Sequence, residues 1–180
     1  LGIVLLMAEA FAGAGHKRGI AYAAIVGLLG VLGATFVANP AAMNAAAPYA
    51  EFYCADFLAM FLKQFALLAT IVVIVMSLEY APTIEASMPS ERRGAGLGEF
   101  FALPVLACAG LMWMASAADF VMIFVSLELV TITFYILVSY LRGSAASLEA
   151  GAKYLVLGAL STGFLVYGIT WIYGVTGHTN

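Results

Sequence analysis

The sequence predicts an all-α, polytopic membrane protein with about six transmembrane helices. Two features of its composition favour this class: 64% of its 180 residues are hydrophobic and only 9% are charged. A soluble domain of this size would have too few polar residues to cover so much apolar surface. The third observation is that the apolar residues form runs long enough to cross a bilayer.

A membrane span needs about 20 mostly apolar residues. The candidate spans are residues 1–14, 19–38, 53–78, 98–118, 119–141 and 148–174. The first span has its basic residues after the apolar run rather than before it, so we expect a helix cut at its start and not a signal peptide. Because no repeat or second domain is evident, residues 1–180 are expected to form a single transmembrane helical domain.

The connections between these spans are predicted from their turn-forming and charged residues. "SAAD", residues 116–119, separates the fourth and fifth spans, and Asp119 can cap the helix that follows. "NPAAMNAAAPYAE", residues 39–51, and the charged segment 79–97 are expected to be loops.

Five of the seven basic residues lie in connections that follow the first, third and fifth spans. They are Lys17, Arg18, Arg92, Arg93 and Arg142. Cytoplasmic loops of membrane proteins carry an excess of Lys and Arg. We therefore expect these loops on the cytoplasmic side of the cell inner (plasma) membrane, with a periplasmic N-terminus.

Glu128 is the deepest acidic residue of the predicted spans. It follows Asp119 by nine residues, or roughly 14 Å of helix, which places it near the bilayer midplane. Thr131, Tyr135 and Ser139 share its helix face, so this stripe should face protein or water. A shielded carboxyl near a cation can change protonation with modest changes in its surroundings, as a proton relay requires. The alternative is a permanently protonated Glu128 that makes one interhelical hydrogen bond.

Lys63 and Lys153 are the two lysines inside predicted spans. Glu149 precedes Lys153 by four residues, the favourable order for a helical ion pair, so a surface pair and a functional role are both open. Lys63 lies about ten residues into its span with Asp56 seven residues before it. Its partner could be Asp56, Glu128 or another subunit.

Other classes of function find little support in the sequence. A net charge of -3 does not favour nucleic-acid binding. Cys54 and Cys108 fall on different predicted helices without metal-binding spacing and are expected to be unpaired packing residues, while His16 and His178 are far apart. No nucleophile motif, phosphate loop or metal cluster is visible, and no cofactor is expected in this chain.

Two long segments carry a family resemblance. "EFFALPVLACAGLMWMASAADFVMIFVSLELVTITFYILVSYLR" and "SLEAGAKYLVLGALSTGFLVYGITWIYGVTG" resemble the N-type antiporter-like subunit of proton-pumping NADH:quinone oxidoreductase, respiratory complex I. "DFLAMFLKQFALLATIVVIVMS" is similar to the third helix of that subunit. The resemblance covers most of residues 53–177.

The resemblance implies the first half of a longer antiporter-like helix bundle, the N-terminal portion of a subunit with some fourteen helices. It implies that Glu128 and Lys153 belong to a proton path and that Lys63 matches a third-helix lysine. From their spacing to these residues, Glu149, Thr131, Tyr135 and Asp56 are possible supporting groups.

The expected function is proton translocation within an enzyme complex whose quinone chemistry lies elsewhere. The expected partners are other hydrophobic membrane-arm subunits and the lipid bilayer. The alternatives are a subunit of a multi-subunit cation/proton antiporter and a non-transporting membrane scaffold. We further expect an axial gap of about 12 Å between Glu128 and Lys153, too long for a direct salt bridge.

Overall fold

The computed structural model describes residues 1–11, 17–40, 44, 52–87 and 97–179. Its helices are α1 (Gly2–Phe11), α2 (Lys17–Val37), α4 (Phe57–Ser87), α5 (Leu97–Met114), α6 (Phe120–Val138) and α7 (Ala145–Thr176). The five helices other than α1 are long and apolar enough to cross a membrane. Within the described ranges the only β pairing is an isolated bridge between Tyr53 and Ala117. The predicted all-α membrane class is confirmed.

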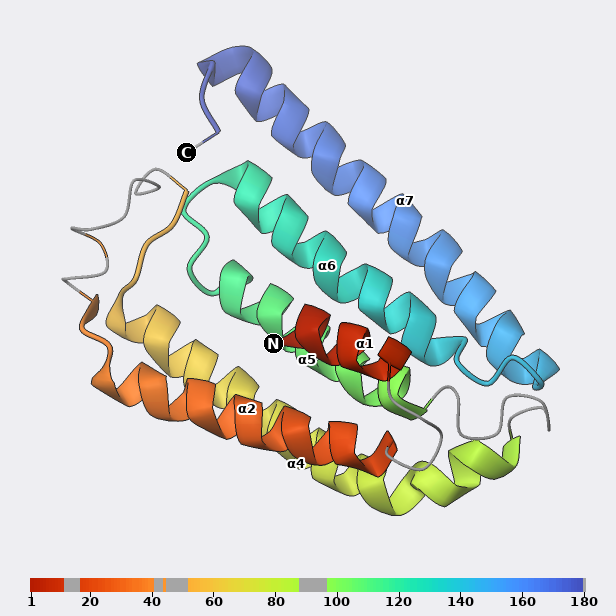
Figure 1. Ribbon diagram of the computed structural model, residues 1–180. Coiled ribbons are helices and arrows are strands. Elements are labelled where there is room, and N and C mark those ends of the chain that lie inside the picture. Colours follow the sequence, from red (N-terminus) through yellow and green to blue (C-terminus); the bar gives the residue numbers. More distant parts are fainter. Residues whose placement is uncertain (12–16, 41–43, 45–51, 88–96, 180) are drawn as a thin grey trace.

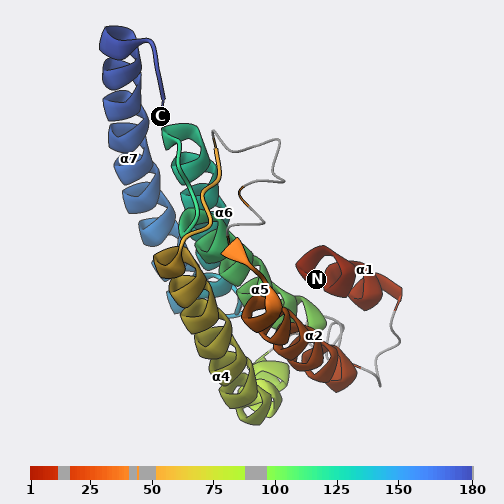
Figure 2. The ribbon, with the colours of Figure 1, turned by 90° about the vertical axis from the view of Figure 1, so that its left-hand side faces the viewer.

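The helices form an elongated bundle with α5 at its centre (Figures 1 and 2). α5 packs against α1, α2, α4 and α6, whereas α7 packs on α6 and forms one edge. The apolar core lies among α1, α2, α4 and α5, where Leu5, Ala24, Leu67, Ile74 and Phe101 are almost fully buried. The short connection between α6 and α7 makes them antiparallel neighbours, as expected from the sequence.

One predicted boundary is wrong. α4 continues to Ser87, so Glu79 and Glu85 lie on a helix and not in a loop. The helix outlasts its most apolar stretch because Ala81 and Ile84, three residues apart on one face, are buried in the core. The rest of that predicted loop, residues 88–96 with Arg92 and Arg93, and most of the predicted loop 39–51 lie outside the described residues.

The ends of α6 and α7 are fixed by local hydrogen bonds. Asp119 caps α6 as predicted: its Oδ1 accepts a hydrogen bond from the backbone N–H of Val121 at 2.7 Å. Ser144 is the N-cap of α7, and Gly177 ends that helix in the left-handed conformation that glycine adopts without strain. With 32 residues, α7 is about 48 Å long, whereas the hydrocarbon core of a bilayer is about 30 Å thick.

Candidate functional site

The Glu128 carboxylate lies in the interface between α6 and α7. Its Oε1 accepts a hydrogen bond from the Thr162 hydroxyl at 2.8 Å, and both residues are half-buried. The prediction that Glu128 faces protein rather than lipid is therefore confirmed. This interhelical hydrogen bond lowers the cost of holding the acid at this depth, and it fits both alternatives for Glu128, a relay group and a permanently protonated acid.

Sequence reasoning missed Thr162 as the partner of Glu128. Counting equal distances from the predicted span ends, residues 141 and 148, points to residue 161 on α7, so the axial level was within reach. The choice between Ser161 and Thr162 was not, because it depends on the rotation of α7 about its axis. Ser161 is exposed and donates to the carbonyl of Leu157 in its own helix.

Tyr135 extends the polar line from Glu128 along the same interface. Its hydroxyl lies directly against the α-carbon of Gly158, where a Cβ atom would overlap it, and its ring meets the ring of Tyr154 edge to face at 5.2 Å. Gly158 and Thr162 are one turn apart on α7, so the Tyr135 hydroxyl meets α7 about one turn from the Thr162 side chain that contacts Glu128.

The other two hydroxyls of the predicted stripe bond to their own helix. The Thr131 hydroxyl donates to the carbonyl of Glu128 at 3.2 Å, and the Ser139 hydroxyl donates to the carbonyl of Tyr135 at 2.7 Å. These bonds satisfy the hydroxyls locally. Each oxygen retains lone pairs that can accept a hydrogen bond from water.

Lys153 is paired with Glu149, as expected from their spacing. Lys153 Nζ and Glu149 Oε1 are 2.5 Å apart, and both side chains are exposed. Lys153 precedes Thr162 by nine residues, which is about 13 Å along α7. Because Thr162 marks the level of the Glu128 carboxylate, this spacing agrees with the predicted axial gap and excludes a direct salt bridge.

Lys63 has a partner that the sequence did not suggest. Lys63 is only 5% exposed, and its ammonium group donates to the Tyr53 hydroxyl at 2.7 Å and lies 4.6 Å from the centroid of the Tyr53 ring. Asp56 instead caps α4, with its Oδ1 accepting from the backbone N–H of Ala59 at 2.6 Å. The structure therefore supplies Tyr53, and neither Asp56 nor Glu128, as the group that holds Lys63.

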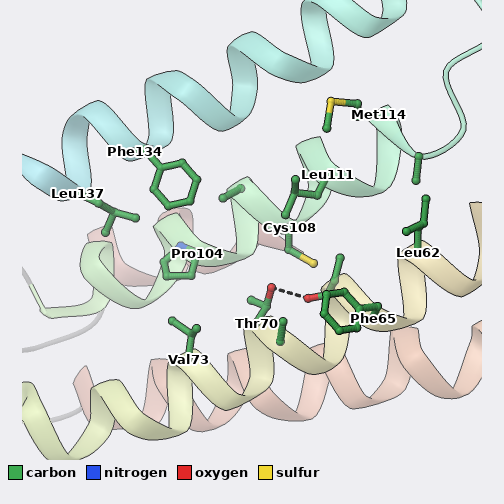
Figure 3. Close-up of a pocket in the computed structure, with 14 residues that line it drawn as sticks. Leu62, Phe65, Thr70, Val73, Pro104, Cys108, Leu111, Met114, Phe134 and Leu137 are labelled. Atoms are coloured by element: carbon green, nitrogen blue, oxygen red, sulfur yellow. Dashed lines mark hydrogen bonds between the residues drawn. The ribbon is translucent and has the colours of Figure 1, made fainter. Parts of the chain in front are cut away.

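An apolar cavity of about 580 Å³ lies between α4, α5 and α6 (Figure 3). Phe65, Pro104, Leu111 and Phe134 line it, and the Thr70 hydroxyl on its wall donates to the carbonyl of Ala66 in its own helix. None of the predicted relay residues lines this cavity. It is therefore separate from the polar line in the α6–α7 interface.

The remaining sequence expectations concern cysteine and metal ligands. Both cysteines are unpaired, but only Cys108 is buried; Cys54 is exposed because it lies in the extended segment before α4, so its predicted packing role is wrong. Among the residues that the structure covers, no group of three His, Cys, Asp or Glu side chains is placed to hold a metal ion.

The sequence of this chain is similar to sequences of known membrane proteins. Residues 117–180 match the family described as NADH:quinone oxidoreductase/Mrp antiporter, transmembrane. The NADH-quinone oxidoreductase subunit N of Heliobacterium modesticaldum is 42% identical over 162 residues, which are 90% of this chain and 32% of that protein. The subunit N of Moorella thermoacetica is 36% identical over 179 residues, covering 99% of this chain and 35% of that protein.

A solved structure shares the fold. It is a chain of respiratory complex I from Thermus thermophilus with bound aureothin, with a TM-score of 0.71 and 24% sequence identity. The match covers 99% of this chain and 36% of that chain. The chain thus spans about a third of the length of the relatives that it matches.

Proposed function

The chain belongs to the family of N-type antiporter-like membrane subunits, and from this premise we propose that it is part of a proton-translocating membrane-arm subunit of respiratory complex I. In this function, protons move along polar and charged side chains while quinone is reduced elsewhere in the complex. The chain contributes to a translocase, NADH:quinone oxidoreductase, and holds no redox centre or cofactor itself.

The position of Glu128 is the observation that carries this proposal. A carboxyl group near the middle of a membrane helix costs about 2.5–3.5 kcal/mol to insert, by analogy with Asp, and such groups usually serve ion or proton pathways. Glu128 meets Thr162 across the α6–α7 interface, with the Tyr135 hydroxyl about one turn away. Protonatable and hydroxyl groups therefore follow one another inside the membrane span.

Lys153 and Glu149 act at the end of this line and not as direct partners of Glu128. The gap of about 13 Å along α7 requires water or hydroxyl groups between the two charges. A proton that reaches Glu128 changes the electric field at Lys153 without direct contact. The hydration of the gap between the two residues controls proton transfer between them. Lys63, held by Tyr53, is a second candidate relay cation.

The proposed setting is the cell inner (plasma) membrane. The first turn of α2, with Arg18, and the connection with Arg142 face the cytoplasm, and the N-terminus faces the periplasm, in accordance with the distribution of basic residues. Other hydrophobic membrane-arm subunits and the lipid bilayer are the proposed partners. Nucleic acid is not among them.

Replacement of Glu128 in the full-length subunit within the assembled complex tests this function. Glu128→Gln should remove most proton pumping into membrane vesicles, because an amide does not exchange a proton, while native gels show normal assembly. Lys153→Met should reduce pumping as well. Glu79→Gln, which alters an exposed carboxyl on α4, is the matched control and should pump normally.

Two results would point to the alternatives. If Glu128→Gln and Lys153→Met both pump normally in an assembled complex, the buried charges serve a scaffold. The family that matches residues 117–180 also includes Mrp antiporters, so a cation/proton antiporter subunit is the second candidate. Transport that depends on sodium would favour it over the complex I function.

A further inference from the structure

A second, polar cavity lies at the end of the bundle where the basic loops join the helices. It has a volume of about 470 Å³ and is enclosed by α1, α5 and the end of α6. Its polar lining consists of Glu9, Glu99, Ser139, Tyr140 and Arg142. Two carboxyls, a phenol and a guanidinium thus face one space, and only Ser139 belongs to the stripe described above.

Exposure falls from the mouth of this cavity to its interior. Glu99 and Arg142 are exposed, Ser139 and Tyr140 are half-buried, and Glu9 is only 6% exposed. The volume is sufficient for several water molecules, since one occupies about 30 Å³ in the liquid, and the lining offers each of them polar partners. Glu9 is therefore the least exposed titratable group of the cavity lining.

The first turn of α5 explains how Glu9 tolerates its burial. Its Oε2 lies directly on the α-carbon of Gly98, where a Cβ atom would overlap it. The backbone N–H groups at a helix start lack intrahelical partners and carry partial positive charge, so they favour a nearby anion. Gly98 is thus the residue that permits the carboxyl to approach the start of α5.

Tyr140 reports that both carboxyls share one electrostatic environment. Burial raises the pKa of Tyr140 far above its usual range, and the negative charges of Glu99 and Glu9 raise it further, against a smaller lowering by the Phe100 backbone and Arg142. Its ring packs on the ring of Phe100 with 5.2 Å between centroids. The phenol therefore stays protonated.

The α6 stripe connects this cavity to Glu128. Ser139 lines the cavity and also packs against Gly151 of α7. Tyr135 follows one turn away on the same face, and Glu128 lies about 16 Å from Ser139 along the helix axis. Helical side chains tilt toward the N-terminus of their helix. The Tyr135 side chain therefore extends toward Glu128 and shortens the gap between Ser139 and Glu128.

We propose that the cavity between α1, α5 and α6 is a water-filled proton entry to the α6–α7 line, with Glu9 as its proton-binding residue. This inference rests on the proposed function and adds its uptake site. A hydronium ion in the cavity gives its proton to the Glu9 carboxylate, forming an O–H bond and leaving a water molecule. Glu9 then returns the proton to a water molecule beside Ser139. This water molecule passes the proton toward Tyr135 and Glu128.

Thiol labelling tests the water in this cavity without reference to pumping. Leu106 lines the polar cavity and Cys108, two residues later on α5, lines the apolar one. In full-length subunit with all other cysteines replaced, a membrane-impermeant maleimide added from the basic-loop side should label Leu106→Cys. It should leave a variant that retains only Cys108 unlabelled. An unreactive Leu106→Cys, or equal labelling of both positions, overturns the water-filled entry.

Proton-pumping assays on the assembled complex test the role of Glu9. Glu9→Gln should slow pumping by roughly tenfold, less than the ~100-fold or more of a lone proton-transfer group because Glu99 lines the same space. The loss should grow as the pH on the basic-loop side rises. Glu9→Asp and added azide, a small weak acid, should restore the rate, whereas a role limited to packing would respond to neither.

The controls separate this inference from the proposed function. Glu79→Gln should pump normally, and Glu128→Gln should fail to pump whatever the pH or azide. If Glu128→Gln stops pumping while Glu9→Gln and the Glu9→Gln/Glu99→Gln pair keep the wild-type rate and pH profile, the entry is wrong and the proposed function stands. If Glu9→Gln does not assemble, the labelling result decides.

Discussion

Helices α5 and α7 both consist mainly of apolar residues, but they have different surroundings. α5 buries nine residues against four neighbouring helices, whereas Gly151 is the only buried residue described in α7. The most apolar 18-residue windows of the two helices have nearly equal mean hydropathies, 1.7 in α5 and 1.8 in α7. Hydropathy measures how readily a segment leaves water and does not distinguish protein from lipid as the receiving phase. The candidate relay nevertheless uses the sparsely packed helix, through Thr162 and Lys153.

Glycine replacement should produce the largest difference between the two helices. In α5, a Cβ on Gly110 would lie 3.0 Å from the carbonyl oxygen of Ser126 and 2.7 Å from Val130 Cγ2 on α6. Gly110→Ala should therefore destabilise the protein by about 1–3 kcal/mol. Gly163→Ala on α7 meets nothing within 4 Å and should be neutral or stabilising by up to about 1 kcal/mol. Thermal unfolding of the full-length subunit in detergent measures both, and equal losses would contradict the comparison.

Removal of the helix caps should give the next largest effect. Asp119 is 3% exposed, caps α6, and also accepts a hydrogen bond from the Thr179 hydroxyl at 2.5 Å. Asp119→Ala should cost about 1–2 kcal/mol, because a buried cap and its partner are lost together. Ser144 caps α7 through a long contact of 3.4 Å to the Ser147 N–H, so Ser144→Ala should cost only a few tenths of a kcal/mol. The same unfolding assay applies, and a larger loss for Ser144 would reverse the ranking.

Gly158 is the position where α7 behaves like α5. Gly158→Ala would place a methyl group on the Tyr135 hydroxyl, so Tyr135 must move. The cost in stability should be below about 1 kcal/mol, since the end of a side chain can shift, but pumping should fall. Tyr135→Phe removes only the nearest contact, because the ring carbons Cζ and Cε1 would still lie 2.7 and 2.8 Å from the new methyl group. The double variant should therefore regain part of the stability without regaining pumping. A double-mutant cycle of Gly158→Ala and Tyr135→Phe measures the coupling between the two positions in stability. Additive effects of the two substitutions would show that the Tyr135 hydroxyl moves aside without cost.

The smallest expected effect is at the exposed ion pair of α7. Glu149→Gln removes the partner of Lys153, but both side chains are more than 60% exposed, so the loss in stability should be below about 0.5 kcal/mol. That loss should shrink as salt is added. A loss well above this value at high salt would mean that another part of the assembled protein covers the pair.

The fold and the site were predictable to different extents. The spans followed from apolar length, the Asp119 cap from its residue type and the Lys153–Glu149 pair from its spacing, because each depends on residues close together in sequence. The position of Tyr53 over Lys63 depends on the segment before α4 folding back onto its own helix. No periodic pattern in the sequence predicts the contact between Tyr53 and Lys63.

Glu9 shows the same limit. In the sequence it is a single acid within an apolar run, with no partner at helical spacing. Its environment comes from the start of α5, 89 residues further on, where Gly98 leaves room for the carboxyl. The depth of Glu128 could be counted along one helix, whereas the burial of Glu9 depends on a close approach between two.

The length of α7 has a consequence for the membrane around it. If the level of Thr162 marks the bilayer centre, Lys153 lies about 13 Å from that centre, and the edge of a hydrocarbon core ~30 Å thick lies about 15 Å from it. Lipids with shorter acyl chains would move this edge past Lys153 and leave the ammonium among headgroups and water. Longer acyl chains would move the edge of the hydrocarbon core beyond Glu149 as well, so that both Lys153 and Glu149 would lie within the hydrocarbon core. Acyl-chain length would then control the hydration of this end of the helix. The rate of proton transfer should therefore differ between membranes of different thickness.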